Sequence, residues 1–167
     1  MTENDPGLII GPLGSGHDRL GFHCGVPSLD DYLEKRARQD IKRRISRVFV
    51  AVEPEFPAAI QGYYTLSALA IELSQLPEAL VRKLPKHPIP AALIGRLAVD
   101  QRGHGRGIGR MLLADAVKRT LSVSNEIAIY AMVVNANDEP AERFYQQFGF
   151  TRLHARERRL FLPLKSF

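Results

Sequence analysis

The sequence predicts an α/β domain, in which a mixed and mostly antiparallel β-sheet carries helices on both faces. Two β-rich segments, residues 47–52 and 59–71, flank a turn with two prolines and are typical of an antiparallel hairpin. The apolar segment 93–99 leads through a glycine-rich loop into an amphipathic helix. A further apolar segment, 127–134, also precedes a helical pattern. Strands and helices that alternate in this way indicate the α/β class.

The composition predicts one globular domain spanning residues 1–167. Hydrophobic residues make up 45% and charged residues 25%, which is ordinary for a soluble domain, and no repeat or linker divides the chain. The net charge of +5 favours anionic partners, nucleic acid among them.

The sequence lacks the usual signals of a membrane, secreted or metal-binding protein. Its apolar stretches are too short for a membrane span, and the acidic start MTENDPGLII is unlike a secretory signal. Cys24 is the single cysteine, which excludes an internal disulfide and fits the cytoplasm. The five histidines are scattered, and only the neighbours His23 and Cys24 weakly resemble metal ligands, so we expect no metal.

The first third of the chain predicts a short strand and a long helix. Residues 8–10 are expected to form the strand, and Ser28 to cap a helix from residue 29 to about residue 45. Apolar residues at helical spacing predict its buried stripe, which consists of Leu29, Leu33, Ala37, Ile41 and Ile45. The other faces are cationic. They are either a solvated surface or a surface that contacts phosphates.

Between the hairpin and the central strand, residues 76–84 predict a short helix, and the proline-rich segment 85–90 is expected to be extended and exposed. After residues 127–134, Asn137 or Asp138 is expected to cap a helix over 139–148, which Gly149 would end with Phe150 folded back onto it. A last strand over 158–164 should pair with a strand near 150–153.

The loop after the central strand carries glycine at every second position from 103 to 109. Glycine lets backbone N–H groups approach a ligand, and the following helix N-terminus favours an anion. Arg102, Arg106 and Arg110 add positive charge, so the sequence predicts a phosphate or pyrophosphate cradle near residues 105–110. The loop does not match the Walker A motif. It also does not match the dinucleotide-binding motif GxGxxG, because Ile108 and Arg110 stand where that motif requires its last glycine. The alternative is a turn without a ligand.

Two segments carry a family resemblance. His104-Gly-Arg-Gly-Ile-Gly109 resembles the acyl-CoA loop of the GNAT N-acetyltransferases, Gln/Arg-x-x-Gly-x-Gly/Ala, with His104 at the first position. The segment 135–150 resembles the GNAT segment in which a tyrosine, here Tyr145, is the general acid. A phenol with a pKa of about 10 is able to protonate a thiolate, although Tyr145 also suits a core aromatic. The resemblance implies a GNAT fold, splayed where acetyl-CoA enters.

The resemblance also implies which residues hold the CoA. They come from the strand, the loop and the end of the next strand. Asn135 would either touch CoA or only cap its loop. The expected residues are Leu97, Ala98, Val99, His104, Gly105, Arg106, Gly107, Ile108, Gly109, Arg110 and Asn135.

A general base is not evident. Residues 91–99 contain no carboxylate, Asp100 suits a turn as well as a base, and Glu139 and Glu142 belong to the last helix. An α-amine has a pKa of about 7.7–8.0 and is partly neutral at physiological pH, whereas a lysine at about 10.4 is not. The missing base therefore favours an α-amine acceptor.

Further segments resemble the toxin branch of GNAT proteins. They are 22–25 (FHCG), 29–33 (LDDYL), 62–67 (GYYTLS), 95–100 (GRLAVD), 143–150 (RFYQQFGF) and 160–163 (LFLP). The resemblance implies a type II toxin that acetylates the α-amine of aminoacyl-tRNA and blocks translation, with Arg96 near the acceptor. Its implied partners are a ribbon-helix-helix antitoxin and, through that complex, operator DNA. A homodimer is also implied as one assembly, and no membrane is involved.

The basic stretches 35–47 and 152–159 are then expected to meet the tRNA backbone. Two alternatives stay open. One is an acetyltransferase of protein N-termini, lysines or small amines, and the other is a non-catalytic co-repressor module that works with DNA.

Overall fold

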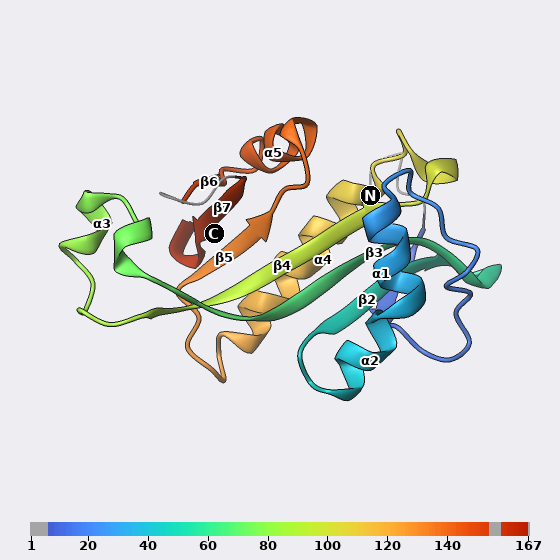
Figure 1. Cartoon of the computed structure of the whole chain (residues 1–167), viewed down its shortest axis with the longest axis horizontal. Coiled ribbons are helices and arrows are strands. Elements are labelled where there is room, and N and C mark those ends of the chain that lie inside the picture. The colour runs from blue at the N-terminus through green and yellow to red at the C-terminus, as the bar shows by residue number, and fades with distance from the viewer. Residues whose placement is uncertain (1–6, 154–157, 167) are drawn as a thin grey trace. The chain divides into compact units, whose positions relative to one another are not determined.

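The computed structural model describes residues 7–153 and 158–166 (Figure 1). The strands of this described part follow the order β1-β2-β3-β4-β5-β7-β6. The chain divides into two compact units, each made of two segments. Met1–Leu66 and Arg96–Val117 form unit 1, and Ser67–Gly95 and Lys118–Phe167 form unit 2.

Unit 1 contains the predicted hairpin. Strand β2, Arg47–Glu53, pairs antiparallel with β3, Phe56–Ile71, from Arg47↔Leu66 onward, with register shifts near Val52. Strand β1, Ile9–Pro12, pairs antiparallel with β2 and extends two residues beyond the predicted segment. The hairpin prediction is therefore confirmed.

The predicted single helix of residues 29–45 is wrong. The segment forms α1, Pro27–Lys35, and α2, Ala37–Lys42, which are separated at Arg36 with φ −122° and ψ −23°. The φ of Arg44 is 60°, in the left-handed region, so the chain leaves the helical path before Ile45. Ile45 is accordingly 58% exposed and is not part of the buried stripe.

Ser28 is not the N-cap of α1. Val26 holds that position without a side-chain hydrogen bond, and Pro27 is the first helical residue, where its missing N–H costs nothing. The carboxylate of Asp30 instead accepts a hydrogen bond of 2.9 Å from the N–H of Cys24. This bond fixes the loop that enters the helix.

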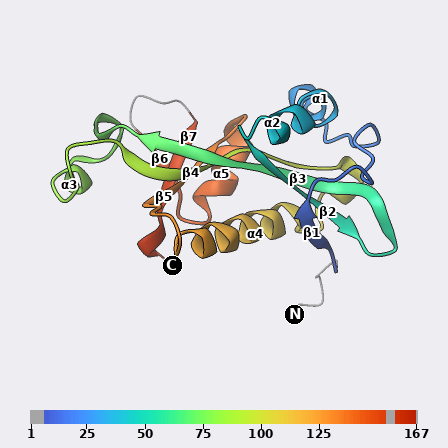
Figure 2. The ribbon, with the colours of Figure 1, turned by 90° about the horizontal axis from the view of Figure 1, so that it is seen from below.

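Helices cover both faces of β3 in unit 1 (Figure 2). The hydroxyl of Tyr63 donates to the Leu29 carbonyl of α1 at 2.6 Å. The neighbouring residue, Gly62, faces the other way, where an added Cβ would lie 2.8 Å from Leu112 of α4, Ile108–Val123. Because successive strand residues point to opposite faces, α1 and the start of α4 lie on opposite sides of β3.

Unit 2 supplies the parallel pairing that makes the sheet mixed. Strand β4, Ile89–Val99, pairs parallel with β5, Ala131–Asn135, over four residues of each. Strand β7, Arg159–Pro163, is antiparallel to β5 and also to β6, Thr151–Arg152. The predicted pairing of the last strand is therefore confirmed.

Two boundaries in unit 2 differ from the prediction. Ile89 is 2% exposed and begins β4, so the proline-rich segment is not exposed throughout. Ile127 is 67% exposed and β5 begins only at Ala131, because turns follow α4 over residues 124–127. Ile127 therefore belongs to the apolar run of the sequence but not to the strand or to the core.

The helices of unit 2 are short. A 3₁₀ turn, Leu73–Gln75, precedes α3, Glu78–Val81, which is shorter than predicted. Helix α5, Glu139–Gln146, begins as predicted at Asp138, whose side chain accepts a hydrogen bond of 2.9 Å from Ala141. Gly149 has a φ of +95°, and the rings of Phe150 and Tyr145 lie 5.7 Å apart, so the predicted fold-back of Phe150 is confirmed.

Each unit contains an apolar cluster of buried side chains. That of unit 1 gathers around Phe22, Tyr32 and Tyr63, and that of unit 2 around Ile71, Val133 and Phe161. In the residues that the structure describes, no helix has both the length and the apolar character that a membrane crossing requires.

Candidate active site

The glycine-rich loop begins at a carboxylate that is saturated with hydrogen bonds. Asp100 follows β4, is 2% exposed, and accepts bonds from the backbone N–H of His23 at 3.0 Å and of Arg102 at 2.9 Å. The Nε of Arg102 adds a third bond at 2.8 Å. Burial alone would raise the pKa of Asp100, but these bonds outweigh it and lower the pKa. Asp100 is thus an ionised anchor of the loop and not a general base.

Glycines of the loop have two different functions. Gly103 is buried in a 3₁₀ turn, Gln101–Gly103, where a Cβ would lie 2.6 Å from Ile108. Gly105 and Gly107 have φ values of +81° and +78°, and a Cβ at either would meet nothing within 4 Å. The first glycine allows close packing, whereas the other two allow the left-handed backbone of an open loop.

Four backbone N–H groups of this loop are free. In the described part of the chain, those of Gly105, Gly107, Ile108 and Gly109 have no hydrogen-bond partner. They lie at the N-terminus of α4, where the helix dipole also favours negative charge. The arrangement fits the predicted pyrophosphate cradle and the backbone amides that would hold it.

The predicted positive charge around the loop is partly neutralised. Arg102 is bound to Asp100, and the Nη1 of Arg106 lies 3.4 Å from a carboxylate oxygen of Glu53. The side chain of Arg110 is exposed on the first turn of α4. The backbone amides, more than the arginines, therefore define this cradle.

His104 connects the loop to β4. Its Nε2 lies 2.8 Å from the carbonyl oxygen of Val99. The N–H groups of Arg96 and Asp100 bond toward β3, to Thr65 and to Gln61, respectively. Because the backbone groups of a strand alternate in direction, those of Leu97 and Val99 point away from β3.

Leu97, Ala98 and Val99 were all expected to contact CoA, but their backbone groups do not all point to the same side of β4. The register with β5 ends at Ile94, so Leu97 and Val99 lie beyond it. Ala98 is 5% exposed, and its carbonyl would lie 3.0 Å from a Cβ on Gly62 of β3. The strand edge that faces away from β3 therefore presents backbone groups of Leu97 and Val99, but not of Ala98.

In unit 2, the candidate acid Tyr145 lies on the buried face of α5. It is 3% exposed, and its ring packs against Phe144 at 5.2 Å and Phe150 at 5.7 Å. Its hydroxyl has no hydrogen-bond partner among the described residues. Every side-chain oxygen or nitrogen of these residues that is fully buried does have a hydrogen-bond partner. The hydroxyl must therefore reach solvent.

Burial raises the pKa of Tyr145 above that of an ordinary phenol. The group consequently stays protonated at every pH at which the protein would work. A buried ring with an accessible and protonated hydroxyl is suited to donate a proton.

The carboxylates of α5 are engaged in ion pairs. Glu142 is 3% exposed, bonds to the Nε of Arg152 and also accepts from its terminal nitrogen at 2.9 Å. The bond with Arg152 lowers the pKa of Glu142. Glu139 pairs with Arg143 at 3.0 Å. Glu142 is therefore not a free base, whereas the pair of Glu139 is exposed and holds its carboxylate weakly.

Two further predicted positions have defined neighbours. The Oδ1 of Asn135 accepts a hydrogen bond of 2.8 Å from the Nε of Arg159. Arg96 has its guanidinium 3.6 Å from the ring centroid of Tyr32. Local sequence patterns did not predict Tyr32 as the support of Arg96, because the two are far apart in the chain. No cluster of three or more metal-ligating side chains exists within residues 7–153 and 158–166.

Comparison with known proteins agrees with this arrangement. A family model described as "Acetyltransferase (GNAT) domain" matches residues 44–152. The tRNA-acetylating toxin of Mycobacterium tuberculosis (strain ATCC 25618 / H37Rv) is 36% identical over 138 residues, which cover 83% of this chain and 81% of the toxin. The chain belongs to the GNAT acetyltransferase family. The GNAT relatives also include the probable toxin TacT of Sinorhizobium fredii (strain NBRC 101917 / NGR234), 33% identical over 95% of this chain and 92% of TacT.

Solved GNAT structures match along nearly the whole chain. A tyrosine-to-phenylalanine mutant of KacT superposes with a TM-score of 0.90 at 31% identity, covering 95% of this chain and 96% of KacT. AtaT complexed with acetyl-methionyl-tRNAfMet gives a TM-score of 0.89 at 31% identity with the same coverage. An AtaT mutant bound to acetyl-CoA and the C-terminus of the antitoxin AtaR gives 0.81 at 29% identity, covering 96% of this chain and 95% of that one.

These findings confirm the predicted GNAT fold class, the acetyltransferase class and the resemblance to the toxin branch. The roles of individual GNAT site residues stay predictions.

Proposed function

We propose that this chain is a toxin that moves the acetyl group of acetyl-CoA to the α-amine of aminoacyl-tRNA and thereby blocks translation. The observation that carries this proposal is the set of four free N–H groups at Gly105, Gly107, Ile108 and Gly109. An acyl donor that carries a pyrophosphate matches this set. The relatives named as tRNA-acetylating toxins support the acceptor.

Acetyl-CoA supplies the acetyl group and a thiolate leaving group when it is bound. The amides of residues 105–109 hold its pyrophosphate, and the backbone groups of Leu97 and Val99 pair with its pantetheine arm. His104, Arg106, Arg110 and Asn135 are the further residues that we propose contact CoA. The whole chain, residues 1–167, acts as one domain in this proposal, since β3, β4 and α4 each run from one unit into the other.

Tyr145 holds the proton that the departing sulfur receives. The hydroxyl, which reaches solvent, supports this assignment, and the raised pKa shows only that the group keeps its proton until a thiolate forms. A phenol that keeps its proton loses it only to a basic atom placed against it, which is the situation when a thiolate forms.

The acceptor is an amine that needs little help to lose its proton. Asp100 and Glu142 are buried and held by arginine, so neither serves as a free base, and Glu139 forms only an exposed surface pair on α5. An α-amine with a pKa of about 7.7–8.0 is neutral in roughly one molecule in ten at pH 7, whereas a lysine of pKa about 10.4 is neutral in fewer than about one in a thousand. This difference supports aminoacyl-tRNA over a lysine side chain.

The proposed partners follow from the same reading. A small antitoxin of the ribbon-helix-helix type neutralises the toxin, and the pair binds operator DNA. The complexes of AtaT with its antitoxin support the first of these. We place the reaction in the cytoplasm, where aminoacyl-tRNA is found, and the active form as a homodimer.

Of the two basic stretches proposed to face tRNA, 35–47 belongs to unit 1 and 152–159 to unit 2, with residues 154–157 outside the described part. Reversing the charges of Arg43, Arg44, Arg158 and Arg159 should weaken tRNA acetylation and spare acetyl-CoA binding. Equal loss of both would argue against contact with tRNA.

A cell-free translation reaction tests the function. Adding the protein should stop protein synthesis only when acetyl-CoA is present, and fresh aminoacyl-tRNA should restore synthesis for a short time. Inhibition that is independent of acetyl-CoA would contradict the enzymatic proposal and favour a binding role.

A further inference from the structure

Helix α5, all of which the structure describes, buries two of its side chains, Glu142 and Tyr145. They are three residues apart and therefore share one face of the helix. Tyr145 is the proposed acid, whereas Glu142 is a carboxylate that is only 3% exposed. Charged side chains are almost never buried unless they are paired. The inner face of this short helix is therefore set by a paired carboxylate as well as by the phenol.

Arg152 binds both oxygens of the Glu142 carboxylate. Its Nε donates to Oε1, and its Nη2 donates to Oε2 at 2.9 Å. A two-point pair between a planar guanidinium and a carboxylate fixes orientation as well as distance, which a single bond does not. Arg152 belongs to β6 and lies in register with Leu160 of β7. The pair thus ties the inner face of α5 to these two strands.

Arg158 approaches the same carboxylate from the residue directly before β7. Its Nη1 lies 3.8 Å from Oε2 of Glu142, and its carbonyl accepts a hydrogen bond of 2.9 Å from the N–H of Ala136, which leads from β5 toward α5. The φ of Arg158 is 55°, a value that residues other than glycine adopt rarely and at a cost. Its surroundings therefore hold it in place. We call Glu142, Arg152 and Arg158 the α5 clamp.

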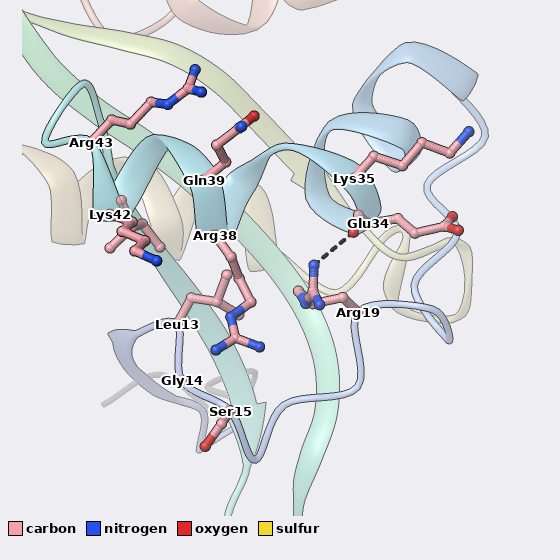
Figure 3. A pocket seen from close by; sticks show the side chains of 11 residues that line it. Leu13, Gly14, Ser15, Arg19, Glu34, Lys35, Arg38, Gln39, Lys42 and Arg43 are labelled. Atoms are coloured by element: carbon pink, nitrogen blue, oxygen red, sulfur yellow. Dashed lines mark hydrogen bonds between the residues drawn. The ribbon is translucent and has the colours of Figure 1, made fainter.

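The arginines of the α5 clamp differ from the basic residues of unit 1. In Figure 3, Arg38 and Lys42 extend from α2 toward the opposite loop, in a hollow that five cationic side chains line. Arg152 and Arg158 instead converge on one buried carboxylate. Both belong to the basic stretch 152–159, so part of the charge of that stretch has a role within the protein.

Resting on the proposed function, we infer that the α5 clamp is a positioning device for acid catalysis, in which Glu142 holds the Tyr145 hydroxyl where it protonates the departing sulfur. Glu142 takes no part in the proton transfer, because Arg152 engages both of its oxygens. The hydroxyl of Tyr145 has no hydrogen-bond partner among the described residues, so its direction depends on the helix that carries it. A misplacement of about 1 Å can lower a rate about a hundredfold, which gives such a clamp kinetic weight.

The variant that tests this inference is Glu142→Gln in the full chain. Glutamine has nearly the shape of glutamate, but it presents one acceptor oxygen and an NH₂ group, so it cannot accept both bonds from Arg152. Arg152→Gln removes the same pair from its side chain that is 59% exposed, and it serves if the first variant fails to fold. The matched control is Arg143→Gln, which removes an arginine of the same helix whose pair with Glu139 is exposed.

The first measurement is kcat for acetyl transfer at saturating acetyl-CoA and aminoacyl-tRNA, in the wild type and in a Tyr145→Phe background. In the wild type, Glu142→Gln should lower kcat about ten- to a hundredfold and leave the Kd of acetyl-CoA unchanged. In the Tyr145→Phe background it should change kcat by less than about twofold, because residues that act as a unit have non-additive effects. The control should have no effect in either background.

The second measurement is independent of acetyl transfer. The chain contains five tyrosines, and a ¹³C label at the ring carbon that carries the hydroxyl gives each of them an NMR resonance. The resonance of Tyr145 is the one that Tyr145→Phe removes. Glu142→Gln and Arg152→Gln should shift or broaden it. Arg143→Gln should leave it in place, although Arg143 is nearer to Tyr145 in the chain.

Two outcomes overturn the inference. One is an effect of Glu142→Gln on kcat that is absent, or that is equal in both backgrounds, as a purely structural role would give. The other is a Tyr145 resonance that responds to the control as strongly as to Glu142→Gln. Either result with a wild type that acetylates aminoacyl-tRNA would leave the proposed function standing.

The proposed function fails in a different way. A wild type that transfers no acetyl group to aminoacyl-tRNA would defeat it. If the Tyr145 resonance of that protein still responded to the clamp variants and not to the control, the positioning of Tyr145 by the α5 clamp would be supported.

Discussion

The guanidinium of Arg96 lies 3.6 Å from the centroid of the Tyr32 ring. The backbone N–H of Arg96 is bonded to Thr65 of β3 at 3.0 Å, and the hydroxyl of Tyr32 donates to Asp40 at 2.8 Å. Arg96 directly precedes the strand segment proposed to pair with pantetheine. The stacking therefore connects that segment to α1 and, through Asp40, to α2.

The energy of this contact is measurable by a double-mutant cycle with Arg96→Met and Tyr32→Leu. A partly buried cation–π contact should give a coupling of about 0.5–2 kcal/mol in the free energy of unfolding. Urea denaturation of wild type, the two single variants and the double variant gives this number. Strictly additive effects would show that the contact has no energetic weight.

The open loop should depend on glycine for its backbone and not for space. Gly105→Ala or Gly107→Ala should cost about 1–2 kcal/mol at a φ near +80° or move the loop amides, weakening acetyl-CoA by about tenfold. Gly16→Ala is the control, because its Cβ also meets nothing and its φ is not in the left-handed region. Calorimetric titration with acetyl-CoA checks this, and equal affinities would remove the loop from the binding site.

Asp100 should matter for stability in a pH-dependent way. Asp100→Asn weakens the bonds to Arg102 and should cost about 1–3 kcal/mol at pH 7. Because its pKa is lowered in the folded state, the contribution is complete above the unfolded value of about 3.9 and is lost as the pH falls through the folded value.

Urea denaturation of Asp100→Asn at pH 7 and below pH 4 tests the sign. The difference from wild type should shrink in acid. The exposed pair of Asp31 with Lys35 supplies a control, since Asp31→Asn should change stability by less than about 1 kcal/mol at either pH. A difference that grows in acid would contradict the assignment of Asp100 as an ionised anchor.

The single cysteine should be unreactive. Cys24 is 7% exposed, and burial, with a hydrogen bond to Asp30, raises its pKa from 9.0 to about 12. Its thiolate fraction at pH 8 should then be about a thousandfold below that of an unfolded chain. The rate of reaction with a disulfide reagent, native against urea-unfolded, measures this. Similar rates would show that the loop of Cys24 opens readily.

Much of the fold was predictable because local chemistry decided it. Asp138 caps α5 and Gly149 ends it, as the polar residue before Pro140 and the glycine after the helix indicated. The break between α1 and α2 was not predictable from periodicity, because residues on both sides of Arg36 are adequate helix formers. The apolar run before β5 misled in the same way, since Ile127 continues the pattern but lies in solvent.

In the candidate site, too, features set by local chemistry were predictable and features set by tertiary contacts were not. The glycine spacing predicted a loop with free amides, because positive φ values are a local property of glycine. The pairing of Arg106 with Glu53, and of Glu142 with Arg152, depends on tertiary structure and was not visible in the sequence. The first pair partly neutralises a positive charge that the sequence placed near the loop, and the second engages a carboxylate that the sequence left as a candidate base.

The most direct test of the account is acetyl transfer from labelled acetyl-CoA to total charged tRNA, with wild type beside Tyr145→Phe. The variant loses only the hydroxyl and keeps the ring contacts with Phe144 and Phe150, so it should fold and bind acetyl-CoA. We predict label on the aminoacyl group with wild type and a fall of about 10²–10⁴ in rate with the variant. Label absent from tRNA with wild type, or an undiminished rate with the variant, would contradict the account.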